Sequence, residues 1–174
     1  IKVTPPTLNF ATSSWSGAYE EVSMSSYAKT LEAGKPELLQ RILLIEVYAF
    51  ATSSTLSNES ITQSSIAAKN IHPAPDWILN GSNVLEANYG VDGTFYAINQ
   101  YKPDSFISVA SSLTTIGGRK FVKITVNPLL YNPSTDDVKK LDEAIIDIGI
   151  DGNAWDVTPP SGSYDVAASI VPNT

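Results

Sequence analysis

The stretch that most restricts the fold of this chain is residues 117–150. β-Branched side chains recur at every second position of its first third, at Val122, Ile124 and Val126. This period-two alternation is typical of a strand with one buried face. Pro128 ends the run, because proline lacks the N–H donor that a sheet needs. The stretch therefore predicts a strand before Pro128 and a hairpin turn at the glycine pair in front of it.

The second half of this stretch fits two kinds of element. Apolar residues spaced three, four and three apart predict the buried stripe of a helix: Val138, Leu141, Ile145 and Ile148. Apolar residues at every second position predict a returning strand instead: Ala144, Ile146, Ile148 and Ile150. The pattern alone leaves both elements open.

A string between these two segments resembles a family signature. The letters VNPLLYNPS follow the basic doublet and the strand, and they resemble a signature of the pro-domains of gingipain-type cysteine peptidases. The matching positions are Gly118, Pro128, Tyr131, Asn132 and Pro133. In that family a strand ends in a Pro-x-x-Tyr-Asn-Pro turn and a second strand returns. The resemblance thus implies a strand over residues 144–150, whereas the more polar residues 136–143 depart from the family pattern and stay open to a helical turn.

Two weaker matches lie earlier in the chain. The letters GKPEL at residues 34–38 resemble the family's lead-in to a long early strand, and IHPAP at residues 71–75 resembles a family connector. The alternative to the strand is a helix that starts at Pro36, since proline is favoured at the first helical position. The family's proline after this leucine is replaced by Leu39, and its Pro-x-Gly after the strand is replaced at residues 48–50.

The rest of the chain supplies short apolar runs separated by glycine and proline. Residues 56–66 are polar enough for a strand at the sheet surface, and further short strands are expected over residues 84–85, 95–101 and 106–113. The spacing predicts an all-β, jelly-roll-like antiparallel β-sandwich. We assign it to residues 1–150, with residues 151–174 as a linker or C-terminal tail.

Composition excludes several classes of function. The chain carries a net charge of −7 and no cysteine, so we expect no nucleic-acid partner, no disulfide and no thiolate metal site. No apolar run reaches the roughly eighteen residues that a membrane span needs. No motif for a metal or a cofactor is present, and we expect none to be bound.

Catalytic residues are not identifiable from the sequence. His72 is the only histidine, and no nucleophile or acid can be assigned to it. We interpret it as an exposed or packed connector residue. The abundant carboxylates form no specific pair, so a carboxylate-based hydrolase is a weaker alternative.

The family resemblance implies a non-catalytic, secreted or cell-surface protein. Such pro-domains cover the active-site cleft of a downstream or cognate cysteine peptidase domain, support its folding and are cut away. The alternative from another class is a secreted β-sandwich binding module for carbohydrate or a cell surface, with exposed aromatic side chains as the platform.

The resemblance further implies a basic residue in a surface loop that enters the peptidase pocket. The candidates are Lys102, in a loop with Pro103, and Arg119, after the glycine pair. Lys102 is favoured because Arg119 adjoins a strand of the sheet. The alternative is that both are ordinary surface charges.

Overall fold

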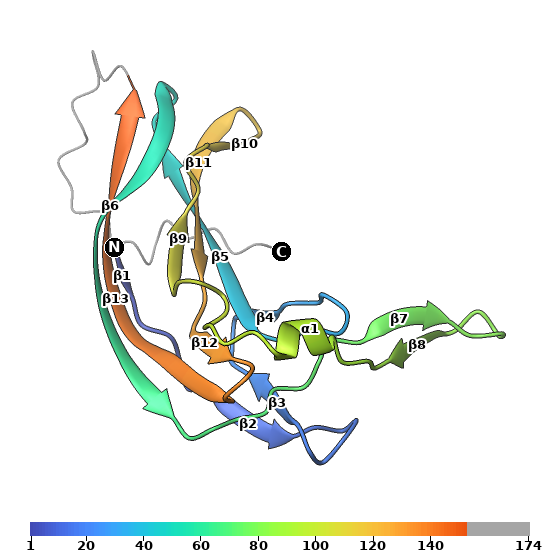
Figure 1. Ribbon diagram of the computed structural model, residues 1–174. Coiled ribbons are helices and arrows are strands. Elements are labelled where there is room, and N and C mark those ends of the chain that lie inside the picture. The colour runs from blue at the N-terminus through green and yellow to red at the C-terminus, as the bar shows by residue number, and fades with distance from the viewer. Residues whose placement is uncertain (153–174) are drawn as a thin grey trace.

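The computed structural model describes residues 1–152, whose strands form two larger sheets and two separate hairpins. The first sheet, at the left of Figure 1, consists of β1 (Lys2–Val3), β6 (Ala51–Ile66), β12 (Leu129–Asn132) and β13 (Asp137–Gly152). The second sheet consists of β4 (Ala28–Lys29), β5 (Leu39–Val47), β9 (Ile107–Val109), β10 (Thr114–Ile116) and β11 (Arg119–Val126). Neighbouring strands in both sheets are antiparallel. The predicted all-β class and antiparallel sandwich are confirmed.

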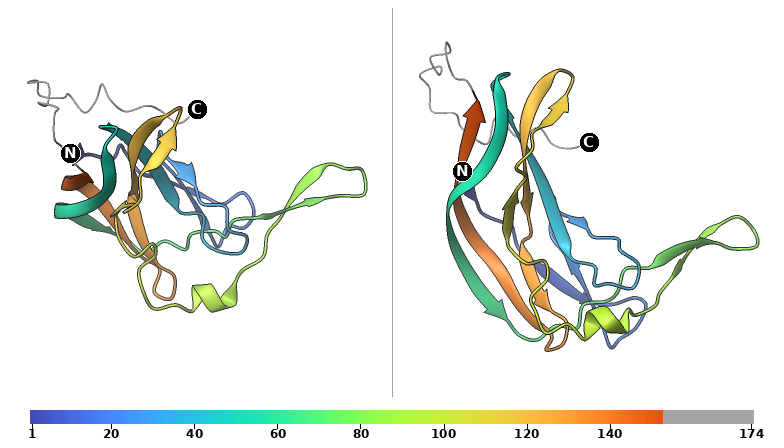
Figure 2. Two further views of the ribbon diagram at one scale, coloured as in Figure 1. Left: turned by 90° about the horizontal axis from the view of Figure 1, so that it is seen from above. Right: turned by 45° about the horizontal axis from the view of Figure 1, so that its top comes forward.

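Two hairpins and a short helix complete the described part of the chain. One hairpin joins β2 (Asn9–Thr12) to β3 (Glu20–Ser23), and the other joins β7 (Asp76–Leu79) to β8 (Leu85–Asn88). The helix α1 (Gly93–Tyr96) follows the second hairpin. In Figures 1 and 2 the β7–β8 hairpin points away from the two sheets in every view.

The core lies between the two sheets. Strand β11 contributes the alternating residues Val122, Ile124 and Val126, each at most 1% exposed. Across from them, β13 contributes Leu141, Ala144 and Ile146, all fully buried. Burial of these apolar side chains is the main force that holds the sheets together. The alternation seen in the sequence is therefore the inner face of the sandwich.

Residues 137–152 form the single strand β13, so the helix predicted as one alternative over residues 138–148 is wrong. The strand pairs with β6 along one edge and with β12 and β1 along the other. Both edges are hydrogen-bonded, so the ladder satisfies backbone groups that a helix would satisfy internally. The strand runs to Gly152, two residues beyond the predicted limit of the domain; the remainder of the predicted tail lies outside the described residues.

Two other elements considered from the sequence are not found. Residues 39–47 form β5, so a helix from Pro36 is wrong; Pro36 instead pairs with Pro73 in an isolated bridge. The strand expected over residues 95–101 is also wrong. Asp92 caps α1 there, with its carboxylate accepting hydrogen bonds from the backbone N–H groups of Thr94 and Phe95.

The signature string forms a corner that runs from the end of β11 through β12 to the turn before β13. Tyr131 is fully buried there among apolar residues of a second core cluster, which includes Val22, Leu39 and Val138. Its hydroxyl donates to Asp136 Oδ1 at 2.7 Å. Burial, and then this carboxylate, raise the pKa of the Tyr131 phenol far above its ordinary value. The ring thus fastens the corner to the hydrophobic cluster.

Tyr131→Ala tests this corner. We expect a loss of about 3–5 kcal/mol in the free energy of unfolding, the range for truncating a buried aromatic side chain. Tyr131→Phe keeps the ring and removes only one hydrogen bond, so about 1 kcal/mol is expected. Urea unfolding of both variants is the measurement. Equal stability of Tyr131→Ala and the wild type would contradict the packing described for the ring.

Candidate partner-binding arm and its anchor

The two basic residues predicted to enter a peptidase pocket are both held in ion pairs. Lys102 Nζ lies 2.7 Å from Asp104 Oδ1, and its backbone exchanges two hydrogen bonds of 2.8 Å with Tyr131. Arg119 begins β11 and makes a forked ion pair with Glu46 of β5. The two residues do not share a site, since Lys102 adjoins β12 and Arg119 lies at the β10–β11 turn (Figure 1). Their proposed inhibitory role stays a prediction.

The signature residues stabilise turns of the fold and do not come together in one site. Gly118 has a φ of 79° in the β10–β11 turn, a conformation that favours glycine. Asn132 donates to Asn99 Oδ1 at 2.9 Å and accepts from the backbone N–H of Ser134 at 3.2 Å. Pro128 and Pro133 bracket the same corner. These contacts are structural ones.

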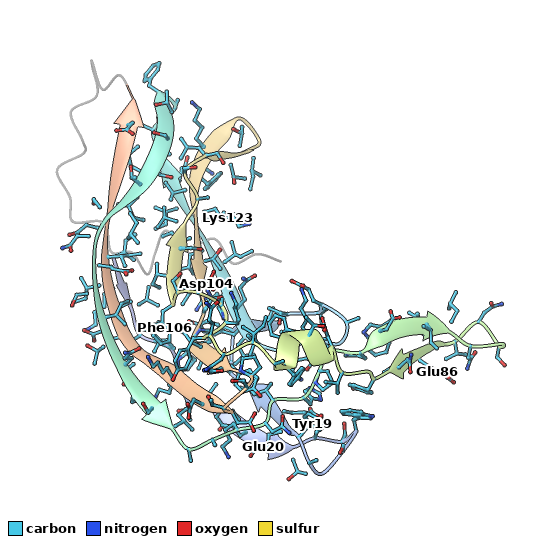
Figure 3. The ribbon with its side chains drawn as sticks, viewed as in Figure 1. Tyr19, Glu20, Glu86, Asp104, Phe106 and Lys123 are labelled. Carbon is cyan, nitrogen blue, oxygen red and sulfur yellow. The ribbon has the colours of Figure 1, made fainter. Side chains whose placement is uncertain are left out.

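The surface that does stand out is the β7–β8 hairpin, which we call the arm. Its large apolar side chains are 44–64% exposed: Trp77, Ile78, Leu79, Val84 and Leu85. Figure 3 shows Glu86 on the arm, well separated from labelled body residues such as Asp104 and Phe106. Exposed apolar side chains clustered on one projecting element are typical of an interaction site.

The pairing register gathers the apolar side chains on one face of the arm. Leu79 pairs with Leu85, and Trp77 pairs with Ala87. Directly opposed residues, and residues two apart on a strand, share a face. These four side chains therefore form a continuous apolar face, whereas the opposite face combines Ile78 with the carboxylate of Glu86.

The tip of the arm is closed by a network around Asn80. Its Oδ1 accepts hydrogen bonds from the backbone N–H groups of Ser82 and Val84, at 2.9 and 3.0 Å. Its amide nitrogen donates to Glu86 Oε1 at 2.5 Å. Asn83 completes the turn with a φ of 58°. The tip is thus ordered by side-chain bonds without any help from the sandwich.

The arm begins beside a buried polar cluster centred on His72. The imidazole Nε2 lies 2.8 Å from Glu37 Oε2, and Nδ1 lies 3.2 Å from Ser13 Oγ. The backbone of His72 bonds in addition to Glu20 and Glu37. His72 therefore joins the chain entering the arm to the β2–β3 hairpin and to the segment before β5.

The chain leaving the arm is fixed by aromatic stacking and by a close backbone contact. Tyr89 stacks on Trp15 with ring centroids 5.2 Å apart, and it lies 5.9 Å from the His72 ring. Asp92 donates its backbone N–H to the carbonyl of Gly34 at 2.9 Å. A Cβ on Gly34, whose φ is 79°, would approach Asp92 N to 3.2 Å, so this contact favours glycine. Both ends of the arm are thereby attached to the body.

Ser13, His72 and Glu37 are the residue types of a hydrolytic triad, but their burial prevents that chemistry. His72 is 2% exposed and Ser13 is 5% exposed, so a substrate cannot reach the hydroxyl. Ser13 Oγ accepts a further hydrogen bond from the Trp15 backbone at 3.2 Å, and Glu37 pairs with Lys29 Nζ at 2.6 Å. The polar atoms satisfy one another, which makes the cluster an anchor.

The sequence had no signal for these partners. Glu37 and Ser13 lie 35 and 59 residues from His72 along the chain. The interpretation of His72 as a connector residue is right for its position, and it is packed rather than exposed. Its bonding to Glu37 is the part that sequence reasoning missed.

A second carboxylate borders the cluster. Glu21 accepts hydrogen bonds from the backbone N–H and hydroxyl of Ser14, at 3.0 and 2.9 Å. The backbone bond is the main cause that holds the pKa of Glu21 below its ordinary value, and Lys29 contributes less. Because the folded-state pKa is lowered, this contribution to stability is present at neutral pH. It is lost as the pH falls through the lowered pKa.

Among residues 1–152, no group of three or more His, Asp or Glu side chains is arranged to hold a metal ion. Within the same range, no helix is long and apolar enough to cross a membrane.

His72→Ala tests the anchor. The substitution removes the imidazole partner of two buried groups, the Glu37 carboxylate and the Ser13 hydroxyl, so we expect the free energy of unfolding to fall by about 2–4 kcal/mol. Limited proteolysis is expected to cut the arm faster than in the wild type. Asn58→Ala, at an exposed position of β6, is the matched control and should change stability by less than about 0.5 kcal/mol. A His72→Ala protein as stable and as resistant as the control would show that the cluster does not anchor the arm.

The sequence matches no family model and no curated protein. Comparison of structures does find similar folds. A chain in the complex of the pro- and mature domains of RgpB from Porphyromonas gingivalis aligns over 88% of this chain and 78% of its own length, with a TM-score of 0.60 and 14% identity. A chain in a structure that concerns the zymogenic latency of gingipain K, from the same organism, aligns over 82% of this chain and 80% of its own, with a TM-score of 0.57 and 18% identity. The resemblance to gingipain-type pro-domains is thereby confirmed at the level of the fold.

Proposed function

We propose that this chain is the non-catalytic pro-domain of a secreted, gingipain-like cysteine peptidase. It covers the active-site cleft of the peptidase, keeps the enzyme inactive and assists its folding. The observation that carries the proposal is the fold, which resembles that of structures containing gingipain pro-domains. The exposed apolar arm supports it, because an element of this kind gains stability from a partner.

A rigid body with a fixed arm suits the covering of a cleft. Binding costs less when the contacting segment is already ordered. Here the hydrogen bonds of Asn80 order the tip of the arm, and those of His72 hold its root, the chain segments that join the arm to the body. Binding therefore costs little conformational entropy. The buried Ser13–His72–Glu37 cluster supports a binding role over a catalytic one.

A stable interface typically buries about 800 Å² on each partner, so a surface larger than the apolar face of the arm favours binding. Exposed apolar side chains near its root extend the available surface: Trp15 is 38% exposed and Val91 is 43% exposed. Trp15 is also stacked on Tyr89 and lies tilted against Tyr19, so it is an ordered aromatic contact. We therefore propose the arm and its root together as the peptidase-binding surface.

Lys102 and Arg119 are the basic residues with which the chain could instead reach an acidic pocket. Each would have to leave a carboxylate partner, Asp104 or Glu46, to enter it. These pairs are partly exposed, so breaking one costs little. Both residues stand as the alternative to the arm, and the titration below tests each directly.

The test is inhibition of a separately produced peptidase domain, the one encoded in the same precursor or in the adjacent gene. We expect the wild-type chain to bind at equimolar ratio and to block peptide hydrolysis. Lys102→Ala and Arg119→Ala are titrated alongside. An inhibition constant raised tenfold or more identifies the residue that enters the pocket, since tenfold equals about 1.4 kcal/mol of binding energy.

Two results would change this account. If both variants inhibit as tightly as the wild type, neither side chain enters the pocket. If the wild type does not bind the peptidase at all, the pro-domain proposal is wrong, and the binding-module alternative becomes the better one.

A further inference from the structure

The projecting arm and its flanks carry no cation. Residues 70–101 contain no Lys or Arg but hold three carboxylates, at Asp76, Glu86 and Asp92. The cations of the chain lie on the body, and seven of the eleven pair with carboxylates: Lys2, Lys29, Lys35, Lys69, Lys102, Arg119 and Lys140. The element best placed to enter a partner therefore offers apolar side chains and negative charge.

The exposed apolar face sets the chemistry of the surface that fits it. Leu79 and Leu85 are paired across the strands and are 64% and 61% exposed, and Trp77 beside them is 55% exposed. A two-stranded hairpin without cover is only marginally stable in water. A partner that buries this face removes apolar surface from water and stabilises the hairpin at the same time.

The composition of this face argues against one kind of pocket. A pocket that selects Lys or Arg carries a carboxylate at its floor, and the apolar face offers no cation to pair with that carboxylate. Basic groups beside an apolar pocket would instead attract Glu86 and Asp76, which lie on the opposite face of the hairpin. Both observations favour an apolar partner pocket.

Resting on the proposed pro-domain function, we infer that the Trp77–Leu79–Leu85 face of the arm occupies an apolar specificity pocket of the partner peptidase. The peptidase that this chain inhibits consequently prefers an uncharged apolar residue over Lys or Arg at its cleavage site. On this inference Lys102 and Arg119 are ordinary surface charges of the body.

The first measurement is the cleavage preference of that peptidase domain. It is assayed on fluorogenic peptides that differ only in the residue before the scissile bond: Leu, Phe, Asn, Lys or Arg. We expect kcat/KM for Leu or Phe to exceed that for Lys and Arg at least about tenfold, as one buried apolar side chain can supply. A preference for Lys or Arg overturns the inference.

The second measurement is inhibition by arm variants of the full chain. Leu79→Ser/Leu85→Ser removes most of the apolar face, and we expect an inhibition constant about 10- to 100-fold higher. Ile116→Ser/Ile145→Ser is the matched control, because these side chains are 51% and 47% exposed on the body. It should inhibit as the wild type does, and unchanged melting temperatures show that both variants fold.

A spectroscopic readout follows the arm directly. With Trp15 and Trp155 replaced by Phe, Trp77 is the only tryptophan in the chain. We expect its emission to shift to shorter wavelength and its quenching by acrylamide to decrease when the peptidase is added.

The outcomes separate the two proposals. If the wild type inhibits but the arm variant inhibits equally well, or Trp77 stays exposed in the complex, the inference about the arm is wrong and the pro-domain function stands. If the wild type neither binds nor inhibits, both are wrong. Loss of inhibition in the arm variant together with an apolar cleavage preference supports both.

Discussion

The bond between His72 and Glu37 is the contact on which the position of the arm depends. Three parts of the chain meet at this imidazole: the β2–β3 hairpin through Ser13, the segment before β5 through Glu37, and the entry to the arm through the His72 backbone. A buried polar group is costly unless it is fully bonded, and every buried side-chain nitrogen and oxygen in the described part of the chain has a partner. The cluster therefore fixes geometry more than it adds net stability.

The sandwich provides the rigidity that this anchor needs. Strand β13 pairs on both of its edges, and its buried face meets that of β11 across the core. Tyr131 fastens the corner from which β12 leads into β13. The pairing of β7 with β8 places Leu79 and Leu85 on the same face of the arm, and both side chains remain largely exposed. A fixed apolar element on a rigid frame is suited to a partner that supplies the missing cover.

The fold was predictable where one face of a strand is buried. Val122, Ile124 and Val126 recur at every second position because their side chains all face the core, whereas Lys123 and Thr125 between them are less buried. Residues 138–148 were ambiguous, since three-four spacing and period-two spacing coexist there. The segment is a strand because it pairs with β6, which is distant in the chain, and the local sequence does not indicate this pairing.

The site was far less predictable. The partners of His72 come from distant parts of the chain, so no spacing rule could assemble them. Trp77 and Leu79 resemble core residues by type, and their exposure follows from the hairpin's departure from the body, which composition does not encode. Lys102 and Arg119 are candidates by their position in the sequence, beside Pro103 and after the glycine pair, and the structure gives each a carboxylate partner.

Hydrogen exchange of the chain, alone and with its peptidase domain, tests the central claim most directly. The account predicts that amides of the arm, residues 76–88, exchange more slowly in the complex, because the partner covers the apolar face. Amides of the β10–β11 turn around Arg119 are predicted to be unchanged. Slower exchange confined to the body, with the arm exchanging as fast as in the free chain, would contradict it.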